Sequence, residues 1–178
     1  ETIRQPISYS RLTNVIAAVG VSVGKSTIIQ YLEYAKESQI LFHVQNYGSK
    51  LVEKTSNPKY YFVDQGILNL FVLDADTALL ENIVAIHLIK NNNRDQVYYY
   101  QNNIEVDFYL PDVQTAIQVC YFLTVLKTRE REVNALIAMA KHINIDNMLI
   151  ITYDEEETIQ VDNLTINVLP VWKWLLTQ

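Results

Sequence analysis

Cysteine is almost absent from this 178-residue chain, and its single one, Cys120, excludes an internal disulfide. Glycine and proline are also scarce, with four of each, which excludes a collagen-like or linker-rich protein. No apolar run approaches the roughly 20 residues that a membrane-spanning helix requires. No signal peptide is visible either, and these absences together predict a soluble protein of the reducing cytoplasm.

The composition is that of a folded chain. Hydrophobic residues make up 49% of the sequence and charged residues 19%, which excludes an intrinsically disordered protein. A chain of this length can bury a core as one large domain or two small ones. Because the first residue is Glu1 and not Met, we expect it to be part of a longer protein.

The charge is negative and unevenly distributed. A formal net charge of −6 argues against a general nucleic-acid binder. Residues 1–64 carry a formal charge of +2 and residues 65–178 carry −8. This asymmetry predicts two modules with a boundary after residue 64. A single domain with an acidic C-terminal face would fit the charge equally well.

Apolar periodicity predicts a winged helix in the first part. We expect two helices and then two strands, with Ser8 capping the first helix and Gly20 ending it. The predicted elements are residues 8–19, 22–38, 39–47 and 59–63, with a polar loop over residues 48–58.

The second part predicts an α/β core, giving an α+β protein overall. The expected order is helix, three strands, helix and strand, followed by a hairpin and a helix that Pro170 opens. The predicted bounds are 77–90, 96–101, 104–110, 115–122, 128–143, 148–153, 159–161 with 164–168, and 171–176.

A glycine-rich stretch at residues 20–27 (GVSVGKST) resembles a phosphate-binding loop but has the wrong spacing. Three residues, not four, separate its two glycines, and a helix precedes it where a buried strand is needed. We therefore expect no ATP site here. The stretch is better interpreted as the turn of a helix-turn-helix whose second helix contacts DNA. The candidate DNA-contacting residues are Lys25, Ser26, Thr27 and Gln30; the alternative is that Ser22 or Ser26 only caps the helix.

The most specific constellation is a set of carboxylates in the second part. Glu81 lies in an otherwise apolar helix, and Glu105 and Asp107 point to one face of a strand. Gln118 and Cys120 share a face of the next strand, so pairing of the strands could bring the four strand residues together. Carboxylates gathered in this way bind Mg²⁺ or Mn²⁺, so Glu81, Glu105 and Asp107 are candidate metal ligands. The alternative is a solvated strand face.

Three segments, in order, resemble one protein family. They are residues 57–67 (NPKYYFVDQGI, pattern PK-x-YF-x-D-x-G), 80–84 (LENIV) and 103–110 (NIEVDFYL). Together with residues 8–47, they resemble the C-terminal region that follows the P-loop domain of many prokaryotic AAA-type ATPases. The resemblance implies a winged helix joined to a PD-(D/E)xK restriction-endonuclease-like domain. It also implies an upstream ATPase domain as a partner, which would carry the ATP. The winged helix makes double-stranded DNA a further candidate partner.

The sequence departs from the pattern of a working nuclease at the strand after Asp107. The expected Glu-x-Lys is Gln118-Val-Cys120 here, so the nuclease positions Glu81, Asp107, Gln118 and Cys120 are degenerate. The first hypothesis is therefore a non-catalytic module that contacts DNA or the ATPase. The alternative is a Mg²⁺-dependent nuclease in which a lysine has migrated, with Lys127 or Lys141 as the candidates.

Three smaller features complete the predictions. Cys120 has no base partner and is interpreted as a buried small apolar residue. His87 lies on an apolar helix face and is interpreted as a core histidine, with no spacing that suggests zinc. Residues 129–132 (RERE), at the start of a helix, are interpreted as a solvated face.

Overall fold

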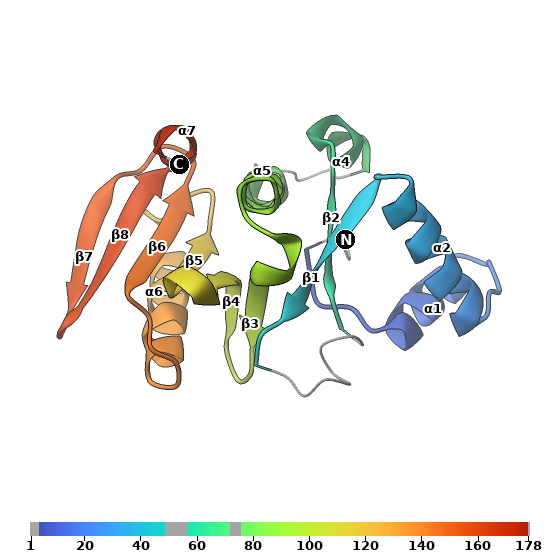
Figure 1. The fold of residues 1–178 in the computed structure, drawn as a ribbon, viewed down its shortest axis with the longest axis horizontal. Helices are drawn as coiled ribbons and strands as arrows, with labels where there is room; N and C mark the ends of the chain where they lie inside the picture. The colour runs from blue at the N-terminus through green and yellow to red at the C-terminus, as the bar shows by residue number, and fades with distance from the viewer. Residues whose placement is uncertain (1–3, 49–56, 72–75, 178) are drawn as a thin grey trace.

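A single mixed sheet of eight strands forms the centre of the molecule in the computed structural model, which describes residues 4–48, 57–71 and 76–177 (Figure 1). Within those residues no helix has both the length and the apolar character needed to cross a membrane. The elements in chain order are α1 (Tyr9–Ala18), α2 (Lys25–Glu37), β1 (Leu41–Asn46), β2 (Lys59–Phe62), α4 (Gln65–Phe71), α5 (Asp76–Asn91), η1 (Arg94–Gln96), β3 (Tyr98–Gln101), β4 (Glu105–Leu110), η2 (Pro111–Val113), β5 (Thr115–Val119), α6 (Leu126–Ala140), β6 (Asn147–Thr152), β7 (Glu157–Val161), β8 (Leu164–Pro170) and α7 (Val171–Leu176).

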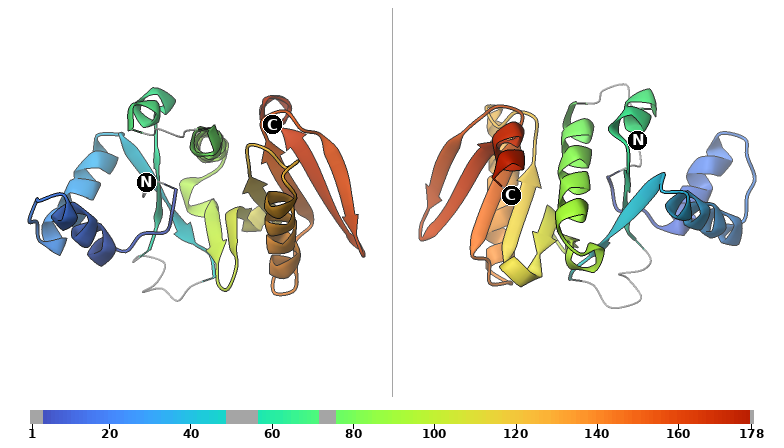
Figure 2. Two further views of the ribbon diagram at one scale, coloured as in Figure 1. Left: turned by 180° about the vertical axis from the view of Figure 1, so that it is seen from behind. Right: turned by 45° about the horizontal axis from the view of Figure 1, so that its top comes forward.

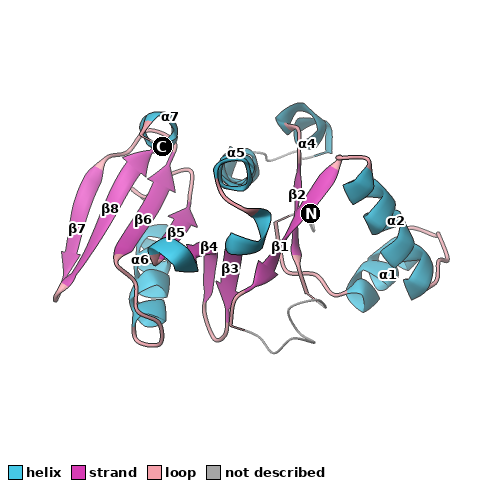
Figure 3. Cartoon of the chain, in the orientation of Figure 1, coloured by secondary structure: helices cyan, strands magenta, loops and turns pink. Residues whose placement is uncertain are grey.

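The strand order is β2-β1-β3-β4-β5-β6-β8-β7 (Figure 3). The outer pairs β1–β2 and β7–β8 are antiparallel, as are β3–β4 and β4–β5, whereas β1–β3, β5–β6 and β6–β8 are parallel. The predicted boundary after residue 64 falls between β2 and α4. The sheet crosses that position in the sequence because β1 pairs directly with β3.

Helices cover both faces of the sheet. One core cluster joins α5 and α7 to one face, with Val84 and Trp174 among its buried residues. The other joins α6 to the opposite face, with Leu136 and Met139 buried. Helices α1 and α2 lie beside β1 and β2, at the end of the molecule away from β7 and β8 (Figures 1 and 2).

The order of elements that the periodicity predicts is confirmed. All six expected helices and strands of the αβββαβ core form, as do the late hairpin and the final helix after Pro170. The predicted third strand of the core extends too far, because β5 ends at Val119. Most of the expected loop at residues 48–58 lies outside the described residues.

Helix α4 is an element that the sequence did not predict. It has seven residues and contains Gly66 and Asn69, so its propensity resembles that of a turn. Its first turn is held by Asp64, whose carboxylate accepts a hydrogen bond from the backbone N–H of Ile67 at 3.1 Å. Helix α4 also contacts α5 and β2. Such tertiary contacts leave no periodic pattern in the sequence of the helix itself.

The helix ends test the predicted caps. Ser8 accepts a hydrogen bond from the backbone N–H of Arg11 at 3.2 Å, and Gly20, beyond the end of α1, has φ of +87°, so both predictions are confirmed. Helix α2 instead begins after Gly24 with no side-chain cap. The interpretation of Ser22 or Ser26 as its cap is therefore wrong.

Candidate functional site

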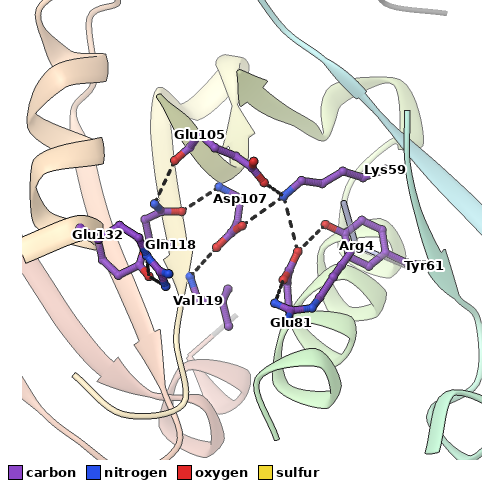
Figure 4. Close-up of polar contacts among 10 residues, drawn as sticks. Arg4, Lys59, Tyr61, Glu81, Glu105, Asp107, Gln118, Val119 and Glu132 are labelled. Atoms are coloured by element: carbon purple, nitrogen blue, oxygen red, sulfur yellow. Dashed lines mark hydrogen bonds and ion pairs between the residues drawn. The ribbon is translucent and has the colours of Figure 1, made fainter. Parts of the chain in front are cut away.

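A buried lysine is the centre of the site. Lys59 lies on β2, and only 1% of its side chain is exposed. Its Nζ atom lies 2.7 Å from Glu105 Oε1, 3.1 Å from Asp107 Oδ1 and 3.6 Å from Glu81 Oε1 (Figure 4). One ammonium group therefore binds three carboxylates that come from α5 and β4.

The geometry of the sheet places Lys59 there. Lys59 and Tyr61 are two residues apart on β2, so they point to the same face, and both contact Glu81. Although β1 and β3 lie between β2 and β4 in the strand order, β2 comes close to β4 over one face of the sheet, because the ring centroids of Tyr61 and Phe108 are 5.6 Å apart. The Nζ atom of Lys59 lies 5.4 Å from the centroid of the Tyr99 ring on β3, a cation–π contact.

Glu81 is the buried carboxylate of the cluster, with a relative exposure of 2%. Its Oε2 lies 3.2 Å from Nη1 of Arg4, and its Oε1 accepts a hydrogen bond from the Tyr61 hydroxyl at 2.8 Å. Burial, together with the negative charge of Asp107, raises its pKa to about 7, while Lys59 and Arg4 oppose that rise. Glu81 is thus the group in the cluster that can take up a proton near neutral pH.

Lys59 itself stays charged. Burial alone would lower its pKa, but Asp107, Glu81 and Glu105 raise the pKa above the ordinary value of a lysine. A buried charge is tolerated only when it is paired and hydrogen-bonded, and here three carboxylates supply the pairing.

Side chains join β4 and β5 where their backbone pairing stops. The regular ladder pairs residues 108–110 with residues 115–117. Beyond it, Gln118 Oε1 accepts from the backbone N–H of Asp107 at 2.8 Å, and Gln118 Nε2 donates to the backbone carbonyl of Glu105 at 3.1 Å. Asp107 Oδ2 in turn accepts from the backbone N–H of Val119 at 2.9 Å. The amide oxygen of Gln118 is therefore used by the backbone.

The three candidate metal ligands do come together, but around an ammonium group. Glu81, Glu105 and Asp107 converge on Lys59 Nζ (Figure 4). Within the described residues, no group of three or more His, Cys, Asp or Glu side chains is arranged to hold a metal ion. The residues present therefore do not fit Mg²⁺ or Mn²⁺, because the lysine lies where the carboxylates meet.

A cavity of about 790 Å³ opens beside this cluster. Its walls include Glu105 and Asp107 together with three arginines, which come from the N-terminal segment, α1 and α6: Arg4, Arg11 and Arg131. Of the three carboxylates bound to Lys59, Glu105 is the most exposed, at 39% of its side chain. The polar cluster thus reaches solvent through Glu105.

Glu132 also faces this cavity, which corrects one prediction. Residues 129–132 were expected to form a solvated face, yet Glu132 is only 4% exposed. Burial raises its pKa, and a hydrogen bond from Nε of Arg131 at 3.0 Å opposes the rise. The run of charged residues predicts a solvated face, but α6 packs against β4 and β5. These contacts join residues that are distant in the sequence, so the local pattern does not indicate them.

The other sequence candidates are not among the ion-pair partners of Glu81, Glu105 and Asp107. Cys120 is 2% exposed in the core beneath α6, where burial raises its pKa to about 12, so the interpretation as a buried apolar residue is confirmed. Lys127 and Lys141, the expected replacements for the missing lysine, are exposed and do not line the cavity. His87 is only partly buried and its ring lies 4.8 Å from that of Trp174, at the edge of the core.

The candidate DNA-contacting residues lie at the start of α2. Lys25, Ser26 and Gln30 are exposed and Thr27 is partly buried. Gln30 Nε2 donates to the Tyr34 hydroxyl at 2.6 Å, so one of the four is engaged within the helix.

Sequence reasoning missed Lys59, Arg4, Tyr61 and Glu132 as members of the site. The available signal was Lys59, a charged residue directly before the aromatic run of a predicted strand. Its alternation with Tyr61 would have placed it on a buried face. It was not connected to the carboxylates because it was assigned to the other module.

The chain is similar to a family of unknown function and to an archaeal protein. Residues 1–79 match the family described as "Domain of unknown function (DUF8612)". The chain is also similar to "Uncharacterized protein MJ1544" of Methanocaldococcus jannaschii, with 32% identity over 183 residues. That alignment covers 96% of this chain but 41% of the relative, so the chain spans about two fifths of the relative's length. No solved structure matches.

Proposed function

We propose that this chain is a non-catalytic interaction module of an AAA-type ATPase. It combines a winged helix with a degenerate PD-(D/E)xK nuclease-like platform. The observation that carries the proposal is the buried Lys59 ammonium, which binds all three candidate metal ligands.

Metal-dependent hydrolysis requires carboxylate oxygens that are free to bind the cation. Both oxygens of Glu81 have protein partners, namely Lys59 and Tyr61 at one and Arg4 at the other. Both oxygens of Asp107 are also engaged, by Lys59 and by the backbone of β5. A cluster with its charges paired in this way acts as a structural support for the fold.

The topology supports the nuclease-like part of the proposal. The order α5-β3-β4-β5-α6-β6 is the helix, three strands, helix and strand that the apolar periodicity predicts for the part that resembles a nuclease-like domain. The acidic residues lie on α5 and at the start of β4, next to the point where β4 and β5 diverge. The order α1-α2-β1-β2 supports a winged helix in the same way.

The surface of α1 and α2 favours a protein partner over DNA. Helix α2 carries two lysines and two glutamates, so its formal charge is zero, and a duplex-binding helix is expected to be basic. Several apolar side chains on or beside these helices are 42–75% exposed: Val15, Val19, Val21, Tyr31 and Tyr34. We propose the upstream ATPase domain of the same protein as the partner.

Fluorescence anisotropy of a labelled DNA duplex, measured across a salt series with Mg²⁺ present, tests the choice of partner. The proposal predicts no binding at low salt, and the duplex should remain intact. Binding that weakens steeply with salt would reveal phosphate contacts and would contradict the proposed partner. In that case Lys25→Ala should weaken binding, whereas the matched control Lys36→Ala, at the other end of α2, should not.

A nuclease with a migrated lysine is the second candidate function, and two observations favour it. Lys59 supplies the cationic side chain that position 120 lacks, and the cavity beside Glu105 has three arginines in its walls. This candidate predicts duplex cleavage in Mg²⁺ or Mn²⁺ that disappears in Asp107→Ala. Such cleavage would overturn the non-catalytic proposal.

A further inference from the structure

The carboxylate cluster has the composition of a cation site, and its cation is part of the protein. We propose that the Lys59 ammonium permanently takes the place of a divalent metal ion, and that removing this ammonium converts the cluster into a Mn²⁺ or Mg²⁺ site. This inference rests on the proposed non-catalytic function and explains how a nuclease-like fold keeps its acidic residues without a metal.

Charge balance is the first argument. The three carboxylates carry three negative charges, and Arg4, bound to Glu81, contributes one positive charge. Without Lys59 the cluster would therefore hold a net charge of −2, which a divalent cation would neutralise. With Lys59 the cluster holds a net charge of −1.

Distance is the second argument. The ammonium lies 2.7 and 3.1 Å from Glu105 and Asp107, whereas Mg²⁺ and Ca²⁺ bind oxygens at roughly 2.0–2.6 Å. These two carboxylate oxygens would have to lie roughly 0.1–1.1 Å closer to the ion than to the ammonium, and Glu105 can move because 39% of its side chain is exposed. Glu81, at 3.6 Å from the ammonium, is near enough to reach the ion through a bound water, which Mg²⁺ commonly retains.

Gln118 is the third argument. A glutamate at this position would add a fourth negative charge next to Asp107, which one ammonium could not balance. The neutral amide instead uses its oxygen and its nitrogen on the backbone of β4. Its chemistry therefore fits a cluster whose central cation is a lysine.

A Mn²⁺ titration followed by electron paramagnetic resonance of the free ion tests the inference on the full chain. Lys59→Met keeps the length of the apolar stem and removes the charge, and we expect it to bind one Mn²⁺ at least tenfold more tightly than the wild type. Lys59→Met with Asp107→Asn should lose that gain. Lys36→Met, which removes a surface lysine paired with Glu33, is the matched control and should behave as the wild type.

The outcomes separate this inference from the proposed function. Equal Mn²⁺ affinity of Lys59→Met and the wild type would overturn the inference and leave the non-catalytic function intact. The inference would also be overturned if the wild type bound Mn²⁺ and the Asp107→Asn variant did not. DNA cleavage by the wild type would overturn the proposed function itself.

A second variant keeps the test decisive if Lys59→Met does not fold without metal. Lys59→Gln removes the same charge, keeps all three carboxylates and places a neutral amide that can donate hydrogen bonds to them. It should still bind Mn²⁺ at least tenfold more tightly than the wild type, because the cluster then holds the same net charge of −2. Failure of this folded variant to do so would overturn the inference.

Discussion

Replacing Lys59 with methionine should be among the most destabilising single changes in this protein. Methionine retains most of the apolar stem, so the change mainly removes the ammonium. It leaves Glu81, which is 2% exposed, beside Asp107 with no cation except Arg4. The carboxylates must then either remain charged and poorly paired or take up protons.

The magnitude follows from the distances. At an effective dielectric constant of about 20, unit charges about 3 Å apart attract each other by roughly 5 kcal/mol, and Lys59 has two such partners, Asp107 and Glu105. The cost of desolvating the lysine offsets much of this attraction. Breaking a buried ion pair by removing one partner typically costs about 3–5 kcal/mol, which is the loss we expect.

Urea denaturation at pH 8 and at pH 5 measures this loss. Lys59 opposes the rise in the pKa of Glu81, so without the ammonium that pKa lies further above its value in the unfolded chain, and the folded variant binds more protons. Its free energy of unfolding must then fall as the pH rises. The difference between Lys59→Met and the wild type should therefore be larger at pH 8 than at pH 5.

The control is Lys36→Met, because Lys36 forms an ion pair with Glu33 on the surface of α2. Exposed pairs of this kind contribute about 0–1 kcal/mol. If Lys59→Met costs no more than this control, or if its cost does not depend on pH, the reasoning about the buried cluster is wrong.

Three further predictions concern single groups around the cluster. The raised pKa of Glu81 makes the folded state bind a proton that the unfolded chain has lost, so this group lowers wild-type stability by about 3 kcal/mol as the pH rises from 4.5 to about 7. Glu81→Gln should remove this dependence on pH, as calorimetry can measure. An unchanged slope in Glu81→Gln would contradict the assignment of Glu81 as the titrating group. Gln118→Leu should lower the free energy of unfolding, measured in urea, by about 2–4 kcal/mol, because the backbone N–H of Asp107 and the carbonyl of Glu105 both lose a buried partner. A loss below 1 kcal/mol would show that water replaces the amide. Cys120 should react with a disulfide reagent at least a hundredfold more slowly in the native protein than in urea, since it is buried and its pKa is raised to about 12, and equal rates would argue against that burial.

The helices and strands could be predicted because their signals are local. The apolar spacing in α5 and α6 and the run of apolar residues in β6 each lie within a single element. The caps at Ser8 and Gly20 are equally local. Helix α4 was missed because its residues have weak propensity and its stability comes from contacts with α5 and β2.

Half of the site could be predicted for the same reason. Alternation along β4 places Glu105 and Asp107 on one face, and Glu81 is conspicuous in its apolar helix. The contact of Lys59 with these carboxylates could not be predicted, because 48 residues separate Lys59 from Asp107. The charge distribution also placed the two residues in different modules. Glu132 was hidden by the charged residues next to it.

The sequence by itself determined the order of elements, the acidic residues and the absence of Glu-x-Lys after Asp107. The tertiary structure alone decided what neutralises those acidic residues. Neighbours in the sequence set backbone conformation and side-chain alternation, but the partner of a buried charge is chosen by the sheet that brings distant strands together. Here the fold brings Lys59 of β2 together with carboxylates of α5 and β4, although 48 residues separate Lys59 from Asp107 in the sequence.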